Sequence, residues 1–281
     1  FDMTEEKALE YATIASQKAI DEFEKQNSIR FILQPKTSSV YKSKIGGIPY
    51  FPKGAEIPLD SDGNQLRFLM QINCDEIKDY FFVKKGIIQF WIGADDCWGM
   101  CDKKGFRVIY YEDISENSVN PPISEFTDEE KECFPLYDEF GVEFIPSVED
   151  IPKDSYKYQK LFCKYFNELS GENIESPYDL EFKLKLSFKV LSKAIYEGCS
   201  SYGHKIGGSS DFCQSDPRDT DELKEKYDFQ LLQMESDYGR INGKNYENIM
   251  WGDSGVCHFF INYEKLKKLD FSDILYYCDC C

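Results

Sequence analysis

Nine polar or aromatic side chains stand in or beside apolar runs of the chain and could together bind a ligand. The chain has only two histidines, and the carboxylates, arginine and tryptophan near them add an acid, a cation and an aromatic platform. An arginine can hold a carboxylate or phosphate through parallel hydrogen bonds, and a tryptophan ring can stack on a planar ligand. The candidate residues are His204, Asp216, Arg218, Gln233, Trp251, Asp253, His258, Gln71 and Gln89.

Two interpretations of these residues are open. Gln71 and Gln233 stand in similar apolar runs, and so do Gln89 and His258. A buried amide or imidazole loses stability unless it finds hydrogen-bond partners. In the first interpretation each side chain fixes the backbone of a neighbouring loop. In the second, the side chains from both halves of the chain line one cleft between those halves.

No motif identifies a reaction, so the sequence leaves open whether the protein is an enzyme. The run Gly252-Asp253-Ser254-Gly255 lacks the Gly-x-Ser-x-Gly spacing of a serine nucleophile. Cys97 and Cys101 are separated by three residues, and three more cysteines stand at the end of the chain, but the paired Cys-x-x-Cys motifs of zinc sites are absent. We therefore predict no metal, no cofactor and reduced thiols.

An internal repeat indicates how the elements that carry these residues are organised. Four pairs of segments match in the same order: 44–47 with 205–208, 69–72 with 231–234, 86–92 with 255–261, and 108–113 with 274–279. The offsets are 161, 162, 169 and 166 residues, far longer than the period of a solenoid repeat. We infer a domain-sized duplication, with a longer loop near Tyr238 to Asn248 where the offset grows.

The matched segments read as strands joined by short turns, which favours antiparallel pairing. In the first of them, strict alternation would place Phe68, Met70 and Ile72 on one face. The spacing of apolar residues predicts helices from Thr4 to about Asn27 and from Ser155 to Leu169. The pattern predicts an α+β fold, predominantly antiparallel β, in which a β-rich unit is duplicated and a few helices lie at its periphery.

These elements suggest four regions. We expect an N-terminal helix and lead-in over 1–34 and a first β-rich repeat over 35–119. An acidic and partly helical insert follows over 120–200, and a second β-rich repeat occupies 201–281. The two repeats are expected to form one inseparable domain.

The motifs that carry a family resemblance are 44–50, 68–73, 204–208, Asp211-Phe212, Gln214, Asp216-Pro217-Arg218, 251–255 and Phe259-Phe260. Together they resemble the YwqG-like family, a domain of unknown function. The resemblance spans nearly the full chain and implies a duplicated β-rich fold, but it supplies no catalytic or binding residues. Where the first Gly-Gly is followed by Ile48-Pro49-Tyr50, the second is followed by Ser209-Ser210, which departs from the expected pattern.

The negative charge of the chain limits the kinds of molecule that it can be expected to bind. The formal net charge is −18, and the stretch from Glu112 to Asp154 holds 14 acidic residues against 2 lysines. This surface disfavours nucleic acid and anionic membranes. Either the acidity serves solubility, or it attracts a basic protein.

We expect a cytoplasmic protein. No stretch approaches the roughly 20 apolar residues of a membrane span, and the acidic first six residues are unlike a signal peptide. The leading hypothesis is a non-catalytic protein-binding protein, of an inhibitor or immunity type, with an acidic aromatic-rich surface. The alternative is a small-molecule-binding protein or enzyme with its polar site in the cleft between the repeats. The oligomeric state is not indicated.

Overall fold

In the computed structural model, the apolar runs of the sequence form a large, mostly antiparallel sheet of ten strands. Their spatial order is β12-β11-β8-β7-β1-β6-β2-β3-β4-β5. The strands are β1 (Gln26–Gln34), β2 (Lys44–Ile45), β3 (Arg67–Asn73), β4 (Ile87–Ile92), β5 (Phe106–Tyr111), β6 (Phe140–Glu149), β7 (Lys205–Gly207), β8 (Phe229–Glu235), β11 (Val256–Ile261) and β12 (Ile274–Asp279). The structure describes residues 3–149, 151–152, 155–184, 188–197, 199, 201–241 and 244–280.

The chain divides into a helical unit and a sheet unit. The helical unit comprises Phe1–Ser28, Val148–Tyr202 and Gly208–Asp211, and the sheet unit comprises Ile29–Ser147, Gly203–Gly207 and Phe212–Cys281. The helices of the first unit are α1 (Glu5–Glu22), α3 (Tyr156–Ser170), α4 (Asp179–Leu184) and α5 (Phe188–Tyr196). The second unit also holds the short helices η1 (Cys74–Glu76), α2 (Asp128–Cys133), α6 (Asp221–Lys226) and α7 (Tyr263–Lys267).

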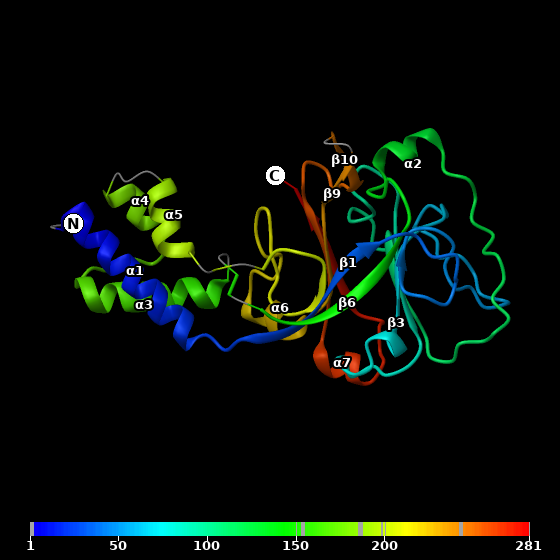
Figure 1. The fold of residues 1–281 in the computed structure, drawn as a ribbon, viewed down its shortest axis with the longest axis horizontal. Helices are drawn as coiled ribbons and strands as arrows, with labels where there is room; N and C mark the ends of the chain where they lie inside the picture. The colour runs from blue at the N-terminus through cyan, green and yellow to red at the C-terminus, as the bar shows by residue number, and fades with distance from the viewer. Residues whose placement is uncertain are drawn as a thin grey trace. The chain divides into compact units, whose positions relative to one another are not determined.

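The helical unit confirms both predicted helices. Thr4 caps α1 by accepting a hydrogen bond from the Lys7 amide, and the left-handed Gly171 ends α3. The helices α1 and α3 lie against each other (Figure 1). A stripe of buried alanines on α1, including Ala12 and Ala15, packs in the same core as the α3 aromatics such as Phe162. Small side chains let the two helix backbones approach closely, so the aromatic rings of α3 can fill the remaining space.

Two groups of four strands in the sheet unit have the same order and the same pairing. The strands β2-β3-β4-β5 lie at one end of the order, and β7-β8-β11-β12 lie at the other. Gln71 faces Gln89 across β3 and β4, as Gln233 faces His258 across β8 and β11. A glycine pair stands at the end of β2 (Gly46-Gly47) and another at the end of β7 (Gly207-Gly208). All four glycines have φ between 65° and 71°. A side chain at these positions would strain the left-handed backbone.

An extra residue interrupts the alternation in both groups. Phe68 pairs with Trp91 and Met70 with Phe90, so Leu69 has no partner opposite it in β4. Leu231 stands in the same position in β8, because Gln230 pairs with Phe260 and Leu232 with Phe259. Beyond such a β-bulge, each side chain points to the face opposite to the one that strict alternation would give it.

The bulge corrects the prediction that Phe68, Met70 and Ile72 share a face. Met70 and Ile72 lie in the main core, whereas Phe68 packs with Trp91 and Phe51 in a separate cluster. The last matched segment is also corrected. The register places Ile274 opposite Ile261 as it places Phe106 opposite Ile92, so 106–111, not 108–113, is equivalent to 274–279.

One large apolar core lies between the two strand groups. Met70, Ile88 and Phe90 from the first group and Leu232 and Phe259 from the second all belong to it. The rings of Phe90 and Phe259, at equivalent strand positions, meet edge to face with centroids 4.9 Å apart. The two groups therefore stabilise each other through shared burial of their inner faces.

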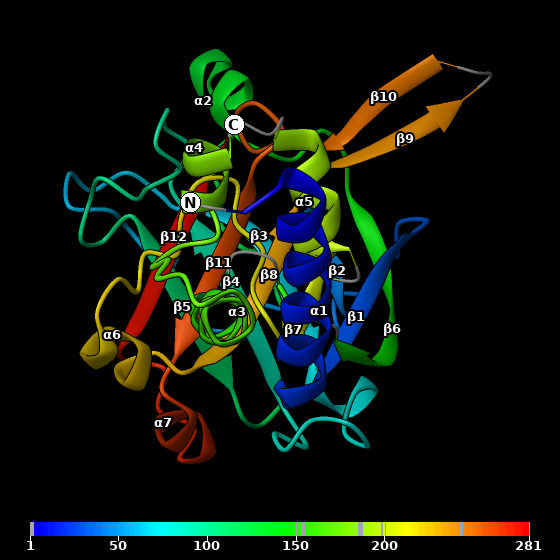
Figure 2. The same ribbon diagram turned by 90° about the vertical axis from the view of Figure 1, so that its left-hand side faces the viewer.

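The expected long loop near Tyr238 is instead a β-hairpin. Strands β9 (Asp237–Ile241) and β10 (Lys244–Ile249) pair antiparallel and extend away from the large sheet (Figure 2). The Asn242-Gly243 pair between them lies outside the described residues, but this dipeptide is the strongest short-range sequence signal for a hairpin. None of the helices formed by the described residues combines the length and the apolar content that crossing a membrane requires.

The shared core predicts a large effect for one ring. Phe90→Ala should lower the free energy of unfolding by about 3–5 kcal/mol, because it removes a fully buried ring that both strand groups contact. Urea denaturation measures the change. The control Tyr80→Ala, whose side chain is 57 % exposed, should change it by less than about 0.5 kcal/mol. Equal effects of the two variants would contradict the shared core.

Candidate functional site

The two glutamines of the first strand group fix a loop to the sheet. The Gln71 Oε1 atom accepts hydrogen bonds from the Tyr50 amide at 2.9 Å and from Gln89 Nε2 at 3.1 Å. The Gln71 Nε2 atom donates to the carbonyls of Val40 and Lys42, both at 2.8 Å. Gln89 Nε2 also donates to the Tyr50 carbonyl at 2.6 Å. Both buried amides are thus engaged with the segment from Val40 to Tyr50.

The second strand group places His204 and Gln233 around Glu235. Gln233 Nε2 donates to Glu235 Oε1 at 2.9 Å and to the Gly203 carbonyl at 3.0 Å, while His204 Nδ1 accepts from the Glu235 amide at 3.1 Å. His204 Nε2 lies 3.6 Å from Asp237 Oδ2. The hydrogen bond with His204 lowers the pKa of Asp237 and outweighs the opposing effect of burial. His258, opposite Gln233, has its Nδ1 atom 3.3 Å from Gln230 Oε1.

Arg218 is held by its own neighbours. Its Nε and Nη2 atoms donate to the two oxygens of Asp216, each at 2.9 Å, and Nη1 donates to the Tyr227 carbonyl at 3.0 Å. Its guanidinium also lies 4.0 Å from the centre of the Phe260 ring. The ring of Phe260 covers one face of the guanidinium. Asp216 and Tyr227 take up the N–H groups that would otherwise donate to a carboxylate or phosphate ligand.

The turn before β11 carries the two remaining predicted residues, Trp251 and Asp253. Trp251 is buried against Trp98 with ring centroids 5.7 Å apart, and its Nε1 atom has no acceptor among the described residues. Asp253 is exposed. The structure therefore joins Gln71 with Gln89, His204 with Gln233, and Asp216 with Arg218. Gln71, Gln89, Gln233 and His258 alternate along their strands with residues of the shared core. Their side chains therefore face away from the apolar space between the strand groups.

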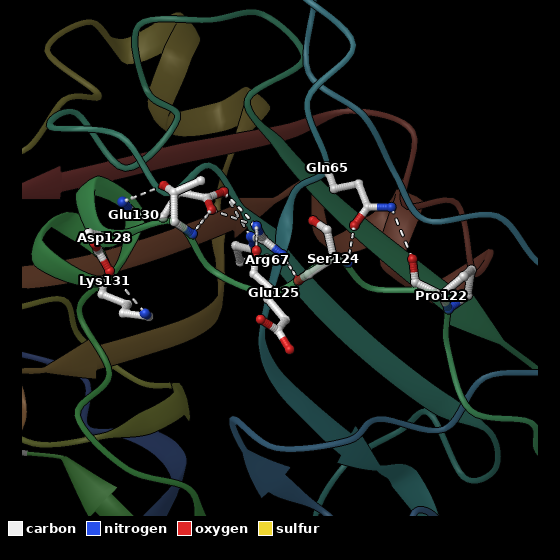
Figure 3. A network of polar contacts seen from close by, with 9 residues as sticks. Gln65, Arg67, Pro122, Ser124, Glu125, Asp128, Glu130 and Lys131 are labelled. Carbon is white, nitrogen blue, oxygen red and sulfur yellow. Dashed lines mark hydrogen bonds and ion pairs between the residues drawn. The ribbon is translucent and has the colours of Figure 1, made fainter.

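A different site forms where the acidic segment meets the sheet. Arg67, at the start of β3, is almost fully buried, and its Nε and Nη2 atoms grip both oxygens of Glu130 at 2.6–2.9 Å (Figure 3). Its Nη1 atom donates to the Ser124 carbonyl at 2.7 Å, and Nη2 donates to the Glu125 carbonyl at 3.3 Å. Its guanidinium lies 4.3 Å from the centre of the Phe126 ring. One cation thus fixes the backbone and a side chain of the segment.

Local hydrogen bonds complete this anchoring. Thr127 caps α2, and Thr127 and Glu130 form a capping box in which each side chain accepts from the other's backbone amide. Gln65 accepts from the Ser124 amide at 2.8 Å and donates to the Pro122 carbonyl at 3.1 Å (Figure 3). Burial acts to raise the pKa of Glu130, but the hydrogen bonds with Arg67 and Thr127 prevail and lower it.

The anchored segment surrounds an aromatic pocket of about 510 Å³. Its lining residues are Glu125, Phe126, Lys131, Phe134, Leu136 and Tyr137. Tyr137 is 60 % exposed, whereas Phe134 is buried and packs against Phe126 with centroids 5.2 Å apart. Exposed carboxylates stand on the same segment at Asp128, Glu129, Glu132 and Asp138. An apolar pocket with several carboxylates beside it suits an apolar side chain flanked by cations.

Sequence reasoning found the acidity of this segment but missed its anchor. Arg67 precedes an apolar run and matches no motif, so the sequence does not mark it as a site residue. The available signal was a charged residue at the border of a run that is otherwise apolar, since a buried arginine requires partners. The partners themselves lie about 60 residues later in the chain, so no local pattern identifies them.

Comparison with protein-family models assigns most of the chain to a family. A family model described as "Domain of unknown function (DUF1963)" matches residues 43–280, which include all the residues of the site described above. No curated protein matches the chain.

The Arg67 contacts predict a pH-dependent loss of stability. Arg67→Met should lower the free energy of unfolding by about 3 kcal/mol at pH 7, because it leaves Glu130 and two carbonyls without their donor. The pKa of Glu130 is lowered in the folded state, so its pairing is fully present above the ordinary value of 4.5 and is lost as the pH falls through the folded-state value. The difference from the unmodified protein should therefore shrink as the pH falls below 4.5.

Urea denaturation over a series of pH values measures this difference. The matched control is Arg107→Met on β5, whose exposed side chain should contribute less than about 0.5 kcal/mol at every pH. A loss at Arg67 that stays constant down to pH 3 would contradict the role assigned to Glu130.

Proposed function

The chain belongs to the DUF1963 family, whose function is unknown, and we propose that this member is a non-catalytic protein that binds a basic protein partner. The observation that carries the proposal is the aromatic pocket beside the anchored acidic helix α2. The partner is expected to insert an apolar side chain into the pocket and to place lysines or arginines against Asp128, Glu129 and Glu132.

Two physical effects support this binding mode. Exposed acidic residues raise the association rate of a basic partner, because attraction acts before contact is made. Affinity comes mainly from a few residues that fill well-packed pockets, and tyrosine is among the residue types that contribute most. Tyr137, exposed at the border of the pocket, is suited to this role.

The fixed backbone of the segment adds a third effect. Arg67 and the capping box hold Ser124 to Glu130 in place before any partner arrives. A segment that is already ordered loses less conformational entropy on binding. An inhibitor or immunity-type protein that covers a basic toxin is the specific form of this proposal.

The alternative, a small-molecule site or enzyme in a cleft between the repeats, receives less support. Gln71 and Gln89 hold a loop, and Arg218 is occupied by Asp216 and Tyr227. The space between the strand groups contains the apolar core where that cleft was expected.

Three finer assignments belong to the same proposal. The equal order, register and bulge positions of the two strand groups support an origin by internal duplication. The motifs quoted from the sequence support a place in the YwqG-like family. The described cysteines form no disulfide, which supports a cytoplasmic location.

Neutralising α2 tests the proposal. A pull-down with the unmodified chain at low salt, followed by mass spectrometry, would identify the partner, and titration calorimetry would give its Kd. The triple variant Asp128→Asn, Glu129→Gln, Glu132→Gln should weaken binding at least tenfold and reduce its salt dependence. Tyr137→Ala should also weaken binding at least tenfold, or about 1.4 kcal/mol.

The matched control removes three charges from α6, a helix of equal length that is also capped by a threonine. Its variant Asp221→Asn, Glu222→Gln, Glu225→Gln should bind with unchanged affinity at matched salt. Equal weakening by the α2 and α6 variants would mean that only net charge matters. A partner whose affinity ignores salt, Tyr137 and α2 would refute the proposal.

A further inference from the structure

The two strands at the ends of the large sheet lie beside each other without pairing. β5 and β12 are the terminal strands of the order, and no ladder joins them in the part of the chain that the structure describes. The ring of Phe106 nevertheless lies 5.1 Å from that of Tyr276, and the ring of Tyr110 lies 5.3 Å from that of Phe271. The later residue of β5 thus contacts the earlier residue of the other segment, which means that the two edges run antiparallel.

The free edge of β5 offers backbone groups that the sheet leaves unpaired. The Gly93 amide donates to the Gly105 carbonyl across the ladder of β4 and β5. Backbone groups alternate in direction along a strand, so those of Phe106, Val108 and Tyr110 point away from β4. None of these groups has a hydrogen-bond partner within the described ranges. A strand edge of this kind is a template for pairing with another chain.

The edge of β12 is free over part of its length. The Cys278 amide donates to Met100 Sδ at 2.9 Å, so this amide points away from β11 and is covered by the loop between β4 and β5. At a spacing of two residues, the backbone groups of Tyr276 and Ile274 point the same way. They have no such partner among the residues that the structure describes. The open part of β12 therefore lies beside the open edge of β5.

A groove of about 650 Å³ lies between these two edges, and we call it the edge groove. Its apolar lining includes Phe106, Val108 and Phe271, whereas Lys103 and Arg107 add positive charge. Five consecutive residues of β5 line it, so at about 3.3 Å per residue it has room for an extended segment of similar length. An apolar floor between two unpaired edges is the surface that an added strand requires.

The charge of the edge groove differs from that of the chain as a whole. Lys103 and Arg107 are exposed and form no ion pair with any residue that the structure describes. Asp273, which also lines the groove, is paired with Lys265 at 2.9 Å and with Lys226 at 3.5 Å. In a chain with a net charge of −18, the groove therefore has a local excess of cations. Carboxylates on the occupant would complement that excess.

We propose that the edge groove binds an extended acidic peptide segment of a partner protein by strand addition. The segment pairs antiparallel with one edge and parallel with the other, because the two edges run antiparallel to each other. Every second side chain of the segment lies on the apolar floor, and the side chains between them direct carboxylates to Lys103 and Arg107. Hydrogen bonds of the main chain supply affinity, and the alternating side chains supply specificity.

Synthetic peptides test the site in the full chain. The probe is a labelled peptide of about seven residues that alternates valine with aspartate and has blocked ends, and fluorescence anisotropy measures its Kd at fixed salt. A peptide that alternates valine with lysine should bind at least tenfold more weakly, because the cations of the groove repel it. The valine–aspartate peptide with N-methylated valine amides keeps its side chains and charge but lacks half of its donors. It should also bind at least tenfold more weakly.

Variants of the chain locate the binding site. Arg107→Glu should weaken binding of the valine–aspartate peptide at least tenfold. The matched control Lys193→Glu makes the same change of charge at an exposed residue of α5 and should leave the Kd unchanged. Circular dichroism verifies that each variant is folded.

Amide hydrogen exchange, measured by nuclear magnetic resonance, tests strand addition directly. The bound peptide should slow exchange at Phe106, Val108 and Tyr110, whose amides point into the groove. Exchange at Arg107 and Ile109 should not change, because their amides already face β4.

Several results would overturn the proposal. They are absence of binding by the valine–aspartate peptide, equal binding of its N-methylated form, equal effects of Arg107→Glu and Lys193→Glu, and protection that does not alternate along β5. A dimer of the chain that Arg107→Glu dissociates in analytical ultracentrifugation would instead assign the groove to a second copy. The partner site beside α2 is tested separately, since neutralising Asp128, Glu129 and Glu132 should leave the affinity for this peptide unchanged at matched salt.

Discussion

The sheet unit depends on one constraint: every second side chain of its inner strands must enter a core that two strand groups share. Because the side-chain period of a strand is two residues, this burial fixes the register of each strand. Phe90 and Phe259 meet in that core, and Gln89 and His258 are consequently turned to the opposite faces. Polar side chains on those faces can then hold the loops that cover them. The positions of the loops follow from the core and not from their own sequences.

The acidic segment adds an electrostatic constraint to this apolar one. Its carboxylates repel one another, and a chain of this charge gains little from burying them. Arg67 resolves the conflict at one point, where its buried guanidinium donates hydrogen bonds to both oxygens of Glu130. Asp128, Glu129 and Glu132 remain exposed to water. A strand residue thus fixes the segment that supplies Phe126 and Tyr137 to the lining of the pocket.

The sequence sufficed for the two long helices and for the strands of the two groups, because these rest on periodicity, and matching residues aligned three of the four segment pairs correctly. It did not predict the strands β6, β9 and β10. Periodicity gave the wrong face where one extra residue shifts the alternation of a strand. Leu69 and Leu231 look like ordinary members of apolar runs, yet each is the extra residue of a bulge, and a bulge has no composition of its own. The sequence also failed for the candidate site. The nine candidates share suitable side-chain chemistry, but residue type does not reveal that Arg218 is already held by Asp216.

The bulge at Leu69 has a wider consequence. Arg67 pairs directly with Ile92, a core residue, so the bulge is what turns the guanidinium to the inner face beneath Phe126. Without the extra residue, Arg67 would lie on the opposite face of the strand, and its guanidinium would point away from α2. The second group keeps the bulge but has Phe229 in place of Arg67, and that ring packs against the core. A single arginine at one of two equivalent strand positions thus distinguishes the strand group that fixes a charged segment from the group that does not.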